Sequence, residues 1–307
     1  MEEKPLLIIL GATASGKTKL AVQVADALGG EIISADSRQI FKRMDIGTGK
    51  DLAEYSINNK NIPYHLIDIL EPGERYHVDA FKKDFYKAFE KITSAGNLPI
   101  LCGGTGMYIH SILQNQPYTA IPVNLAFRNE LESLPKEELV TRLETYEAEL
   151  TNHVDKSSKK RLIRAIEIAE YLNHNALEEE DYPKFKPLVV GLKNEVEITR
   201  SNILKRLDYR LKNGMIEEVE QLIKDGVSKD TLIFYGLEYK FIVMYLNGEM
   251  TFDELQLKLG TAICQFAKRQ NTFFRKMEKD GISINWLNAN QETNHLKQQI
   301  LEMVSIN

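Results

Sequence analysis

The chain has 307 residues, of which 43% are hydrophobic and 27% are charged, and its formal net charge is −5 at pH 7. These fractions are those of an ordinary globular protein, and the length allows one large domain with an insertion or two modest domains. The charge excludes a protein covered in positive potential, although it is compatible with local basic patches.

The sequence predicts a cytoplasmic protein that does not enter a membrane. Its first residues carry no basic segment followed by an apolar core, as a signal peptide would. Its longest apolar runs have the length of strands and fall short of the roughly 20 residues that a membrane helix needs. The two cysteines, Cys102 and Cys264, cannot form a disulfide framework, which favours a reducing compartment. The six histidines show no metal-ligand spacing, which argues against a structural zinc site.

The first part of the chain alternates predicted strands and helices. Residues 6–10 form a continuous apolar run, as in a parallel strand that is buried on both faces. A helix is predicted over residues 18–28. Further strands are predicted at 31–34, 64–70, 98–102 and 187–192, with a helix at 81–92. This alternation predicts an α/β fold in which helices cover both faces of a doubly wound parallel sheet.

Strand signals are absent between residues 119 and 157. Pro135 is suited to the first position of a helix, and Leu139 and Leu143 recur on one helical stripe. We predict a small all-helical insertion domain at 119–157 within a core formed by residues 1–118 and 158–307. The last part of that core is predicted to be helical at 197–212, 215–224, 237–247 and 252–279, with a short strand at 282–287.

Residues 11–18 read GATASGKT and match the phosphate-binding loop (P-loop) G-x-x-x-x-G-K-[ST] between a predicted strand and a predicted helix. Glycines let the backbone wrap an anion, and the amides and dipole of the helix start favour negative charge. Lys17 supplies a cation, and the Thr18 hydroxyl is placed to hold Mg²⁺. We predict that a diphosphate or triphosphate binds to Gly11, Ala12, Thr13, Ala14, Ser15, Gly16, Lys17 and Thr18. The motif does not by itself identify the reaction.

Asp36 follows the second predicted strand in the segment SADSRQIF, residues 34–41. In a doubly wound sheet the carboxyl ends of neighbouring strands line one crevice, which places Asp36 near Lys17 and Thr18. Three roles are open for its carboxylate: a magnesium ligand, a general base that takes a proton from a nucleophile, or a helix N-cap.

Five motifs resemble those of the tRNA dimethylallyltransferases, also called tRNA isopentenyltransferases, in their order and spacing. They are GATASGKT (11–18), SADSRQIFKRMDIGTGK (34–50), HLIDILEP (65–72), GGTGMYI (103–109) and AKRQNTFFR (267–275). The resemblance covers nearly the whole chain, and it implies a core like that of the P-loop NTPases that carries out an alkyl transfer.

The resemblance implies that a dimethylallyl group passes from dimethylallyl diphosphate to the exocyclic amine of adenosine 37, next to the anticodon. The implied tRNAs read codons that begin with U, and Mg²⁺ is the implied cofactor. By match to the family motifs, Asp36 accepts the amine proton, Lys17 and Thr18 hold the diphosphate, and Arg210 stabilises it as it departs. Arg206 lies four residues before Arg210, so both can face one site from a helix.

Two basic clusters are candidates for tRNA contacts in this acidic protein. Residues 156–164 read KSSKKRLIR, and residues 268–279 carry basic side chains around Phe273 and Phe274. Basic side chains contact phosphates, aromatic rings stack on unstacked bases, and the target adenine must be flipped out to reach a buried diphosphate. The expected tRNA-binding residues are Asp36, Ser37, Arg38, Gln39, Thr105, Lys160, Arg161, Arg164, Lys268 and Arg269. By resemblance, the insertion is expected to clasp the anticodon stem.

Three other functions have to be distinguished from this one. An adenylate dimethylallyltransferase shares the core and alkylates free AMP, ADP or ATP, but it would not require the insertion or the basic clusters. A kinase would bind ATP at residues 11–18, and a non-catalytic RNA-binding protein could keep the fold. We expect the partners to be dimethylallyl diphosphate and the anticodon stem-loop of a tRNA, and the protein to act as a monomer.

Overall fold

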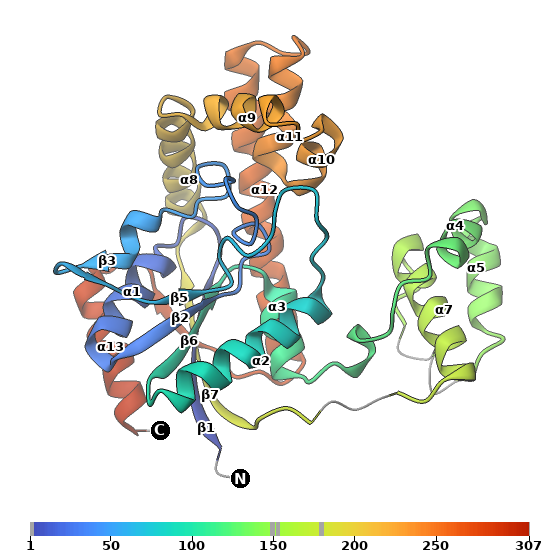
Figure 1. Cartoon of the computed structure of the whole chain (residues 1–307), viewed down its shortest axis with the longest axis horizontal. Helices are drawn as coiled ribbons and strands as arrows, with labels where there is room; N and C mark the ends of the chain where they lie inside the picture. The colour runs from blue at the N-terminus through green and yellow to red at the C-terminus, as the bar shows by residue number, and fades with distance from the viewer. Residues whose placement is uncertain (1–2, 148–150, 152–153, 178–180, 307) are drawn as a thin grey trace. The chain divides into compact units, whose positions relative to one another are not determined.

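The structure is a computed structural model of the chain (Figure 1). It describes residues 3–147, 151, 154–177 and 181–306. The chain divides into two compact units. Unit 1 comprises Met1–Leu113 and Pro183–Asn307, and unit 2 comprises Gln114–Tyr182.

Unit 1 is built on a parallel sheet whose strands, within the described residues, have the order β5-β2-β6-β1-β7-β8. Their bounds are β1 Lys4–Gly11, β2 Gly30–Ser34, β5 Tyr64–His65, β6 Leu98–Gly103, β7 Phe185–Lys193 and β8 Asn285–Asn288. The central strand β1 pairs with both neighbours, since Leu7 is in register with Ile100 of β6 and with Leu188 of β7. Every residue from Leu6 to Leu10 is buried, which explains the continuous apolar run. The predicted doubly wound parallel sheet is confirmed.

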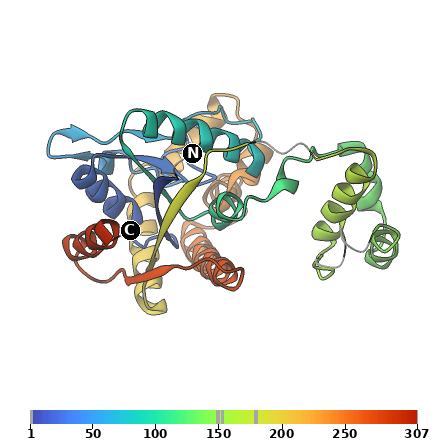
Figure 2. The same ribbon diagram turned by 90° about the horizontal axis from the view of Figure 1, so that it is seen from below.

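Helices cover both faces of this sheet (Figure 2). They are α1 (Lys17–Leu28) and α13 (Thr293–Ile306) on one face, and α2 (Val78–Ser94) and α3 (Gly106–Leu113) on the other. On the first face, Leu20 and Ile300 share a buried cluster with Leu7. On the second, the rings of Phe81 and Tyr108 stack with centroids 4.1 Å apart. The helices α3 and α13 were not predicted.

The predicted strand at residues 64–70 is wrong beyond its first two residues. Only Tyr64–His65 pairs with β2, because Leu66 and Asp68 have φ values of 61° and 55°, which a strand does not accommodate. The Asp68 carboxylate also accepts a hydrogen bond from the buried ammonium of Lys50. A contact distant in the sequence therefore overrides the apolar pattern. Between β2 and β5 the chain forms η1 (Leu52–Tyr55) and an unpredicted hairpin of β3 (Ser56–Ile57) and β4 (Lys60–Asn61).

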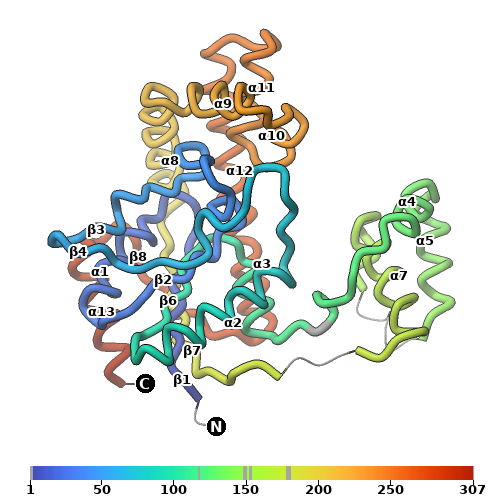
Figure 3. The backbone as a smooth tube through the Cα atoms, viewed as in Figure 1, coloured from blue at the N-terminus to red at the C-terminus, as the bar shows by residue number. Residues whose placement is uncertain are grey.

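The C-terminal helices gather beyond the carboxyl ends of the strands (Figure 3). They are α8 (Val196–Leu211), α9 (Met215–Lys224), α10 (Lys229–Tyr235), α11 (Leu237–Leu246) and α12 (Phe252–Lys279). Their buried side chains form a second core that also contains Phe41 and Met44. The segment that follows β2 is therefore packed against these helices, which brings the motif at residues 34–50 to the C-terminal half of the chain.

Unit 2 is helical within its described residues. Its helices are α4 (Leu125–Ser133), α5 (Lys136–Leu143) and α7 (Lys159–His174), after the short helix η2 (Pro117–Thr119). The insertion was expected to end at residue 157, but unit 2 extends to Tyr182, because Leu162 and Ile166 of α7 pack with Leu131 and Leu139. Residues 148–150 and 152–153 of the expected insertion lie outside the described residues. In the part of the chain that the structure describes, no helix has both the length and the apolar character needed to cross a bilayer.

Candidate active site

The P-loop joins β1 to α1 at the carboxyl edge of the sheet. Gly16 has a φ of 80° and Ala14 one of 61°, left-handed values that turn the backbone around the space in front of α1. Gly11 is needed because a Cβ there would lie 2.7 Å from Ser15 Oγ and 3.1 Å from the carbonyl oxygen of Leu192. Among the described residues no side chain caps the start of α1, so its first amides are free to meet an anion.

An open cavity of about 470 Å³ lies in front of this loop. The residues that line it are Thr13, Ala14, Ser15, Gly16, Lys17, Thr18, Asp36, Gln39, Thr48, Gly49, Asp51, Glu54, Asn202, Lys205, Arg206 and Tyr209. The structure thus brings most of the predicted anion-binding loop and Asp36 to one cavity. Gly11 and Ala12 are buried beneath its wall.

The buried side chain of Gln270 on α12 holds the P-loop from behind. Its Oε1 accepts a hydrogen bond from the backbone N–H of Thr13 at 2.9 Å, and its Nε2 donates to the carbonyl oxygen of Gly104 at 2.9 Å. Position 104 must be glycine for this contact, because a Cβ would lie 2.5 Å from Gln270 Nε2. This role of Gln270 was not predicted, although the residue lies inside the motif AKRQNTFFR.

Asp36 lies in a turn after β2 rather than at the start of a helix. Its Oδ1 accepts the backbone N–H of Arg38 at 3.0 Å, and the N–H of Ser37 donates to Thr105 Oγ1 at 3.1 Å. A Cβ at position 103 would lie 2.2 Å from the carbonyl oxygen of Ala35, so the glycine lets β6 approach this turn closely. The turn is therefore held by the GGTG motif, and one oxygen of Asp36, Oδ2, makes no hydrogen bond to a described residue.

The two arginines of α8, Arg206 and Arg210, differ in their position relative to the cavity. Arg206 lines the cavity, and its Nη2 donates a hydrogen bond to Thr13 Oγ1. Arg210 is buried, does not line the cavity, and places its Nη2 2.7 Å from Asp51 Oδ2. Sequence reasoning placed both arginines on one face, and the structure adds that Arg206 is the one in contact with the P-loop.

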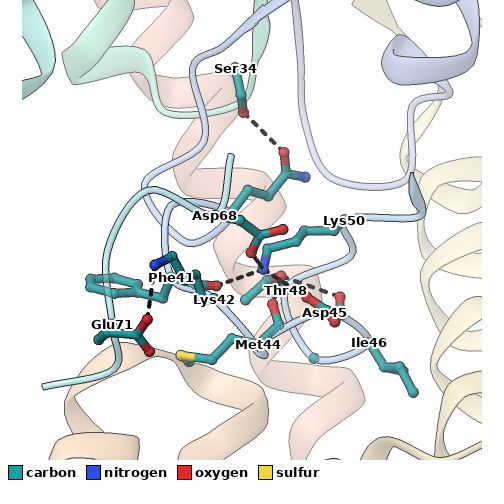
Figure 4. Close-up of polar contacts among 12 residues, drawn as sticks. Ser34, Phe41, Lys42, Met44, Asp45, Ile46, Thr48, Lys50, Asp68 and Glu71 are labelled. Atoms are coloured by element: carbon teal, nitrogen blue, oxygen red, sulfur yellow. Dashed lines mark hydrogen bonds and ion pairs between the residues drawn. The ribbon is translucent and has the colours of Figure 1, made fainter. Parts of the chain in front are cut away.

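The turn at residues 41–51 is fixed from inside by the buried Lys50 (Figure 4). Its ammonium donates to the carbonyl oxygen of Phe41 at 2.6 Å, to Asp45 Oδ1 at 2.7 Å and to Asp68 Oδ1. From outside, the Glu218 carboxylate on α9 accepts the backbone N–H groups of residues 45, 46 and 47 at 2.8, 2.6 and 3.1 Å. This double clamp explains why a long segment without regular structure has a defined shape at the cavity. Neither Lys50 nor Glu218 was predicted as a functional residue.

The cations at the cavity are held in surroundings that disfavour their charge. Burial lowers the pKa of the Lys17 ammonium, while the nearby Asp36 carboxylate acts in the opposite direction. Burial and the charge of Arg210 lower the pKa of Arg206 to about 10, so its guanidinium stays charged at neutral pH. A bound anion would favour both charges and would raise both pKa values.

The oxygen donors at the cavity suit a magnesium ion. No group of three or more His, Cys, Asp or Glu side chains in the described chain is arranged to hold a metal. The cavity nevertheless offers the Thr18 hydroxyl and the carboxylates of Asp36, Asp51 and Glu54. Mg²⁺ takes one or two protein oxygens and completes its shell with phosphate oxygens and water. The residues present therefore fit Mg²⁺ that is bound together with a diphosphate.

The candidate tRNA-binding residues fall into three groups. Ser37, Arg38 and Gln39 belong to the turn that carries Asp36, and Thr105 contacts this turn from the segment after β6. The amide of Gln39 is engaged internally with Ser34 Oγ and with the carbonyl oxygen of Gly49. Lys268 and Arg269 are exposed on α12, next to the buried Gln270.

The third group lies in unit 2. Lys160 is exposed, and Arg161 is exposed and paired with Asp155. Arg164 is only 28% exposed and donates hydrogen bonds to the carbonyl oxygens of Tyr118 and Ile121. Its guanidinium thus stabilises unit 2 itself, in contrast to the side chain of Lys160.

Comparisons with known proteins agree on one family. The chain matches the family model described as IPP transferase over residues 39–277 and the model described as isopentenyl transferase over residues 4–67. It is 47% identical over 306 residues to tRNA dimethylallyltransferase 2 of Bacteroides fragilis, which covers 98% of this chain and 100% of that relative. It is 47% identical over 293 residues to tRNA dimethylallyltransferase 1 of Parabacteroides distasonis, 95% of each chain. The solved structure of the tRNA isopentenylpyrophosphate transferase from Bacillus halodurans is 30% identical, with a TM-score of 0.72 over 99% of this chain and 96% of that one.

Proposed function

Since this chain belongs to the IPP transferase family, we propose that it transfers a dimethylallyl group from dimethylallyl diphosphate to adenosine 37 of tRNA. The acceptor is the exocyclic amine, and the tRNAs are those that read codons beginning with U. One observation carries the proposal: the anion-binding loop and the Asp36 carboxylate line the same cavity. A diphosphate held by this loop and the carboxylate that takes the amine proton would therefore share one space.

The P-loop and α8 supply the positive charge that the departing diphosphate needs. The first amides of α1, the Lys17 ammonium and the Arg206 guanidinium face the space where the diphosphate binds. Ser15 Oγ is buried and has no hydrogen-bond partner among the described residues, so it is able to donate to a phosphate oxygen. Arg210 stands one helical turn farther along α8. Preorganised cations of this kind stabilise charge that develops on the leaving oxygen.

Mg²⁺ would be held by the Thr18 hydroxyl and by oxygens of the diphosphate, and it supplies additional stabilisation of the leaving group's charge. The hydroxyl of Thr18 lines the cavity at the first turn of α1.

Asp36 acts as the general base. The amine nitrogen forms a bond to the allylic carbon, the bond from that carbon to the diphosphate oxygen breaks, and the amine proton passes to Asp36. The bonding electrons leave with the diphosphate. The hydrogen bond from the N–H of Arg38 fixes Oδ1, which leaves Oδ2 for the proton.

The tRNA is held by residues around this cavity and by unit 2. Ser37 and Arg38 share the turn of Asp36, and Thr105 contacts that turn through Ser37, so these three residues surround the flipped adenosine. Lys268 and Arg269 contact phosphates of the anticodon loop. The helices of unit 2 clasp the anticodon stem with Lys160 and Arg161, while Arg164 supports them from within unit 2. We take the protein to act as a monomer in the cytoplasm, where its tRNA substrates are.

The proposal is tested by an Asp36→Ala variant with an unmodified anticodon stem-loop, Mg²⁺ and dimethylallyl diphosphate. Loss of a positioned general base is expected to lower the rate of alkylation about a hundredfold, while the affinity for the stem-loop is nearly kept. Wild-type activity in the variant would show that Asp36 is not the base. A parallel reaction with AMP instead of RNA separates this function from that of an adenylate dimethylallyltransferase, which would prefer the free nucleotide.

A further inference from the structure

The guanidinium of Arg210 forms an ion pair with the carboxylate of Asp51. Its side chain is only 10% exposed, and its Nη2 lies 2.7 Å from Asp51 Oδ2. Asp51 is its hydrogen-bond acceptor among the described residues, has a side chain that is 45% exposed, and lines the cavity together with the P-loop. One carboxylate therefore stands between the anion site and a buried cation.

The backbone around Asp51 holds this pair in place. A Cβ at Gly49 would lie 2.9 Å from both Nη1 and Nη2 of Arg210, so the chain runs directly against the guanidinium. Lys50, between these two residues, is buried and bound to three oxygen atoms. Asp51 itself has a φ of 33°, and its carbonyl oxygen accepts the N–H of Glu54 at 2.8 Å. The backbone that carries the carboxylate is thus held in place on both sides of Asp51.

Several charged side chains lie near Arg210, and Asp51 differs from the others in pairing with it directly. Arg206 lies one turn earlier on α8, and the repulsion between the two guanidiniums contributes to the lowered pKa of Arg206. The carboxylates of Glu54 and Glu238 also act on these arginines. Asp51 is the one that forms a direct ion pair with Arg210 in the described chain.

We propose that Asp51 is a positioning residue that occupies Arg210 in the free enzyme and competes with the diphosphate for it. The inference rests on the proposed function, because it takes the anion at the P-loop to be diphosphate. To reach Arg210, diphosphate must break the ion pair between Asp51 and Arg210 or bind to Arg210 alongside Asp51. Part of the binding free energy of the diphosphate is lost in this way, so both the substrate and the diphosphate product bind less tightly. The pair thereby favours release of the diphosphate after alkyl transfer.

The test is the Kd of inorganic diphosphate, measured by isothermal titration with the full chain in the presence and absence of Mg²⁺. Asp51→Asn keeps the size of the side chain and removes its charge. Because the pair is partly exposed, we expect a moderate effect, a Kd about fivefold lower than that of the wild type. Tighter binding is a result that damage to the fold would not produce, and the thermal midpoint of the variant confirms that it is folded.

Two controls make the result specific to the pair. Glu54→Gln removes another carboxylate charge from the same cavity, and its Kd should change by less than half as much. In an Arg210→Met background, Asp51→Asn should change the Kd no more than Glu54→Gln does, because the competition has been removed and only the general effect of the lost charge remains.

The outcomes separate this inference from the function on which it rests. If the wild type does not bind diphosphate at all, the proposed function fails. If the wild type binds but Asp51→Asn binds equally or more weakly, with or without Mg²⁺, Asp51 does not compete for Arg210. An effect as large in Glu54→Gln, or one that persists undiminished without Arg210, would also overturn the proposal.

Discussion

Replacing Lys50 by methionine removes the buried ammonium that holds the turn at residues 41–51. Taking one partner out of a buried ion pair typically costs about 3–5 kcal/mol. Here the side chains of Asp45 and Asp68 are 52% and 32% exposed, so their carboxylates regain water. The carbonyl oxygen of Phe41 loses its partner, which costs about 1–3 kcal/mol. We therefore expect the free energy of unfolding of unit 1 to fall by about 3 kcal/mol, near the lower end of the range for buried pairs.

In a domain of this size each kcal/mol lowers the thermal midpoint by about 2–4 °C, so the expected shift is about 6–12 °C. The fluorescence of Trp286, the chain's one tryptophan, reports on unit 1, since this residue lies in β8. Lys42→Met is the matched control, because Lys42 belongs to the same turn but is 46% exposed in its pair with Glu71 (Figure 4). The control should keep the wild-type midpoint. Equal midpoints for both variants would refute the assignment of Lys50 as the clamp of this turn.

Two further predictions concern the P-loop. Gln270→Leu leaves the N–H of Thr13 and the carbonyl oxygen of Gly104 without partners, which should lower the free energy of unfolding by about 2–4 kcal/mol and weaken diphosphate binding. Gln265→Leu, at an exposed position of the same helix, should do neither in parallel denaturation and titration experiments. Equal behaviour of the two variants would contradict the bridging role of Gln270. For Lys17, burial lowers the pKa in the free protein and a bound diphosphate raises it again, so between these two pKa values binding takes up a proton and the affinity falls as pH rises. Titrations in two buffers of different ionisation enthalpy measure this uptake, which should disappear in Lys17→Met; identical apparent enthalpies for the wild type across that pH range would speak against it.

The parts of the fold that could be predicted are those with local signals. The apolar run of β1, the P-loop and the start of α1 follow one another within a few residues, and the structure has them as predicted. The family predicted from five motifs is confirmed by the family model and by the relatives. In each case the sequence pattern and the local geometry have the same cause.

The parts that escaped prediction depend on contacts between distant residues. The strand predicted at 64–70 does not extend beyond His65, because the Asp68 carboxylate accepts a hydrogen bond from the Lys50 ammonium. Gln270 contacts Thr13, which lies 257 positions away in the sequence. The motif around Gln270 was interpreted as a basic surface because Lys268 and Arg269 stand next to it. The end of the insertion was placed too early, because only tertiary packing shows that the apolar side of α7 belongs with α4 and α5.

The two arginines of α8 illustrate the same limit. A spacing of four residues predicts that Arg206 and Arg210 share a helix face, but it does not tell which one meets the P-loop. That distinction depends on Asp51, which lies more than a hundred positions away in the sequence and engages Arg210.

The central claim is that the anion held in front of α1 is a leaving group on carbon. It is tested most directly by mass analysis of the nucleosides from an unmodified anticodon stem-loop after reaction with the protein, Mg²⁺ and dimethylallyl diphosphate. We predict that adenosine 37 carries one dimethylallyl group and that one diphosphate is released for each modified nucleoside. Unaltered RNA, together with transfer of the γ-phosphate of ATP to an acceptor in a parallel reaction, would contradict the claim.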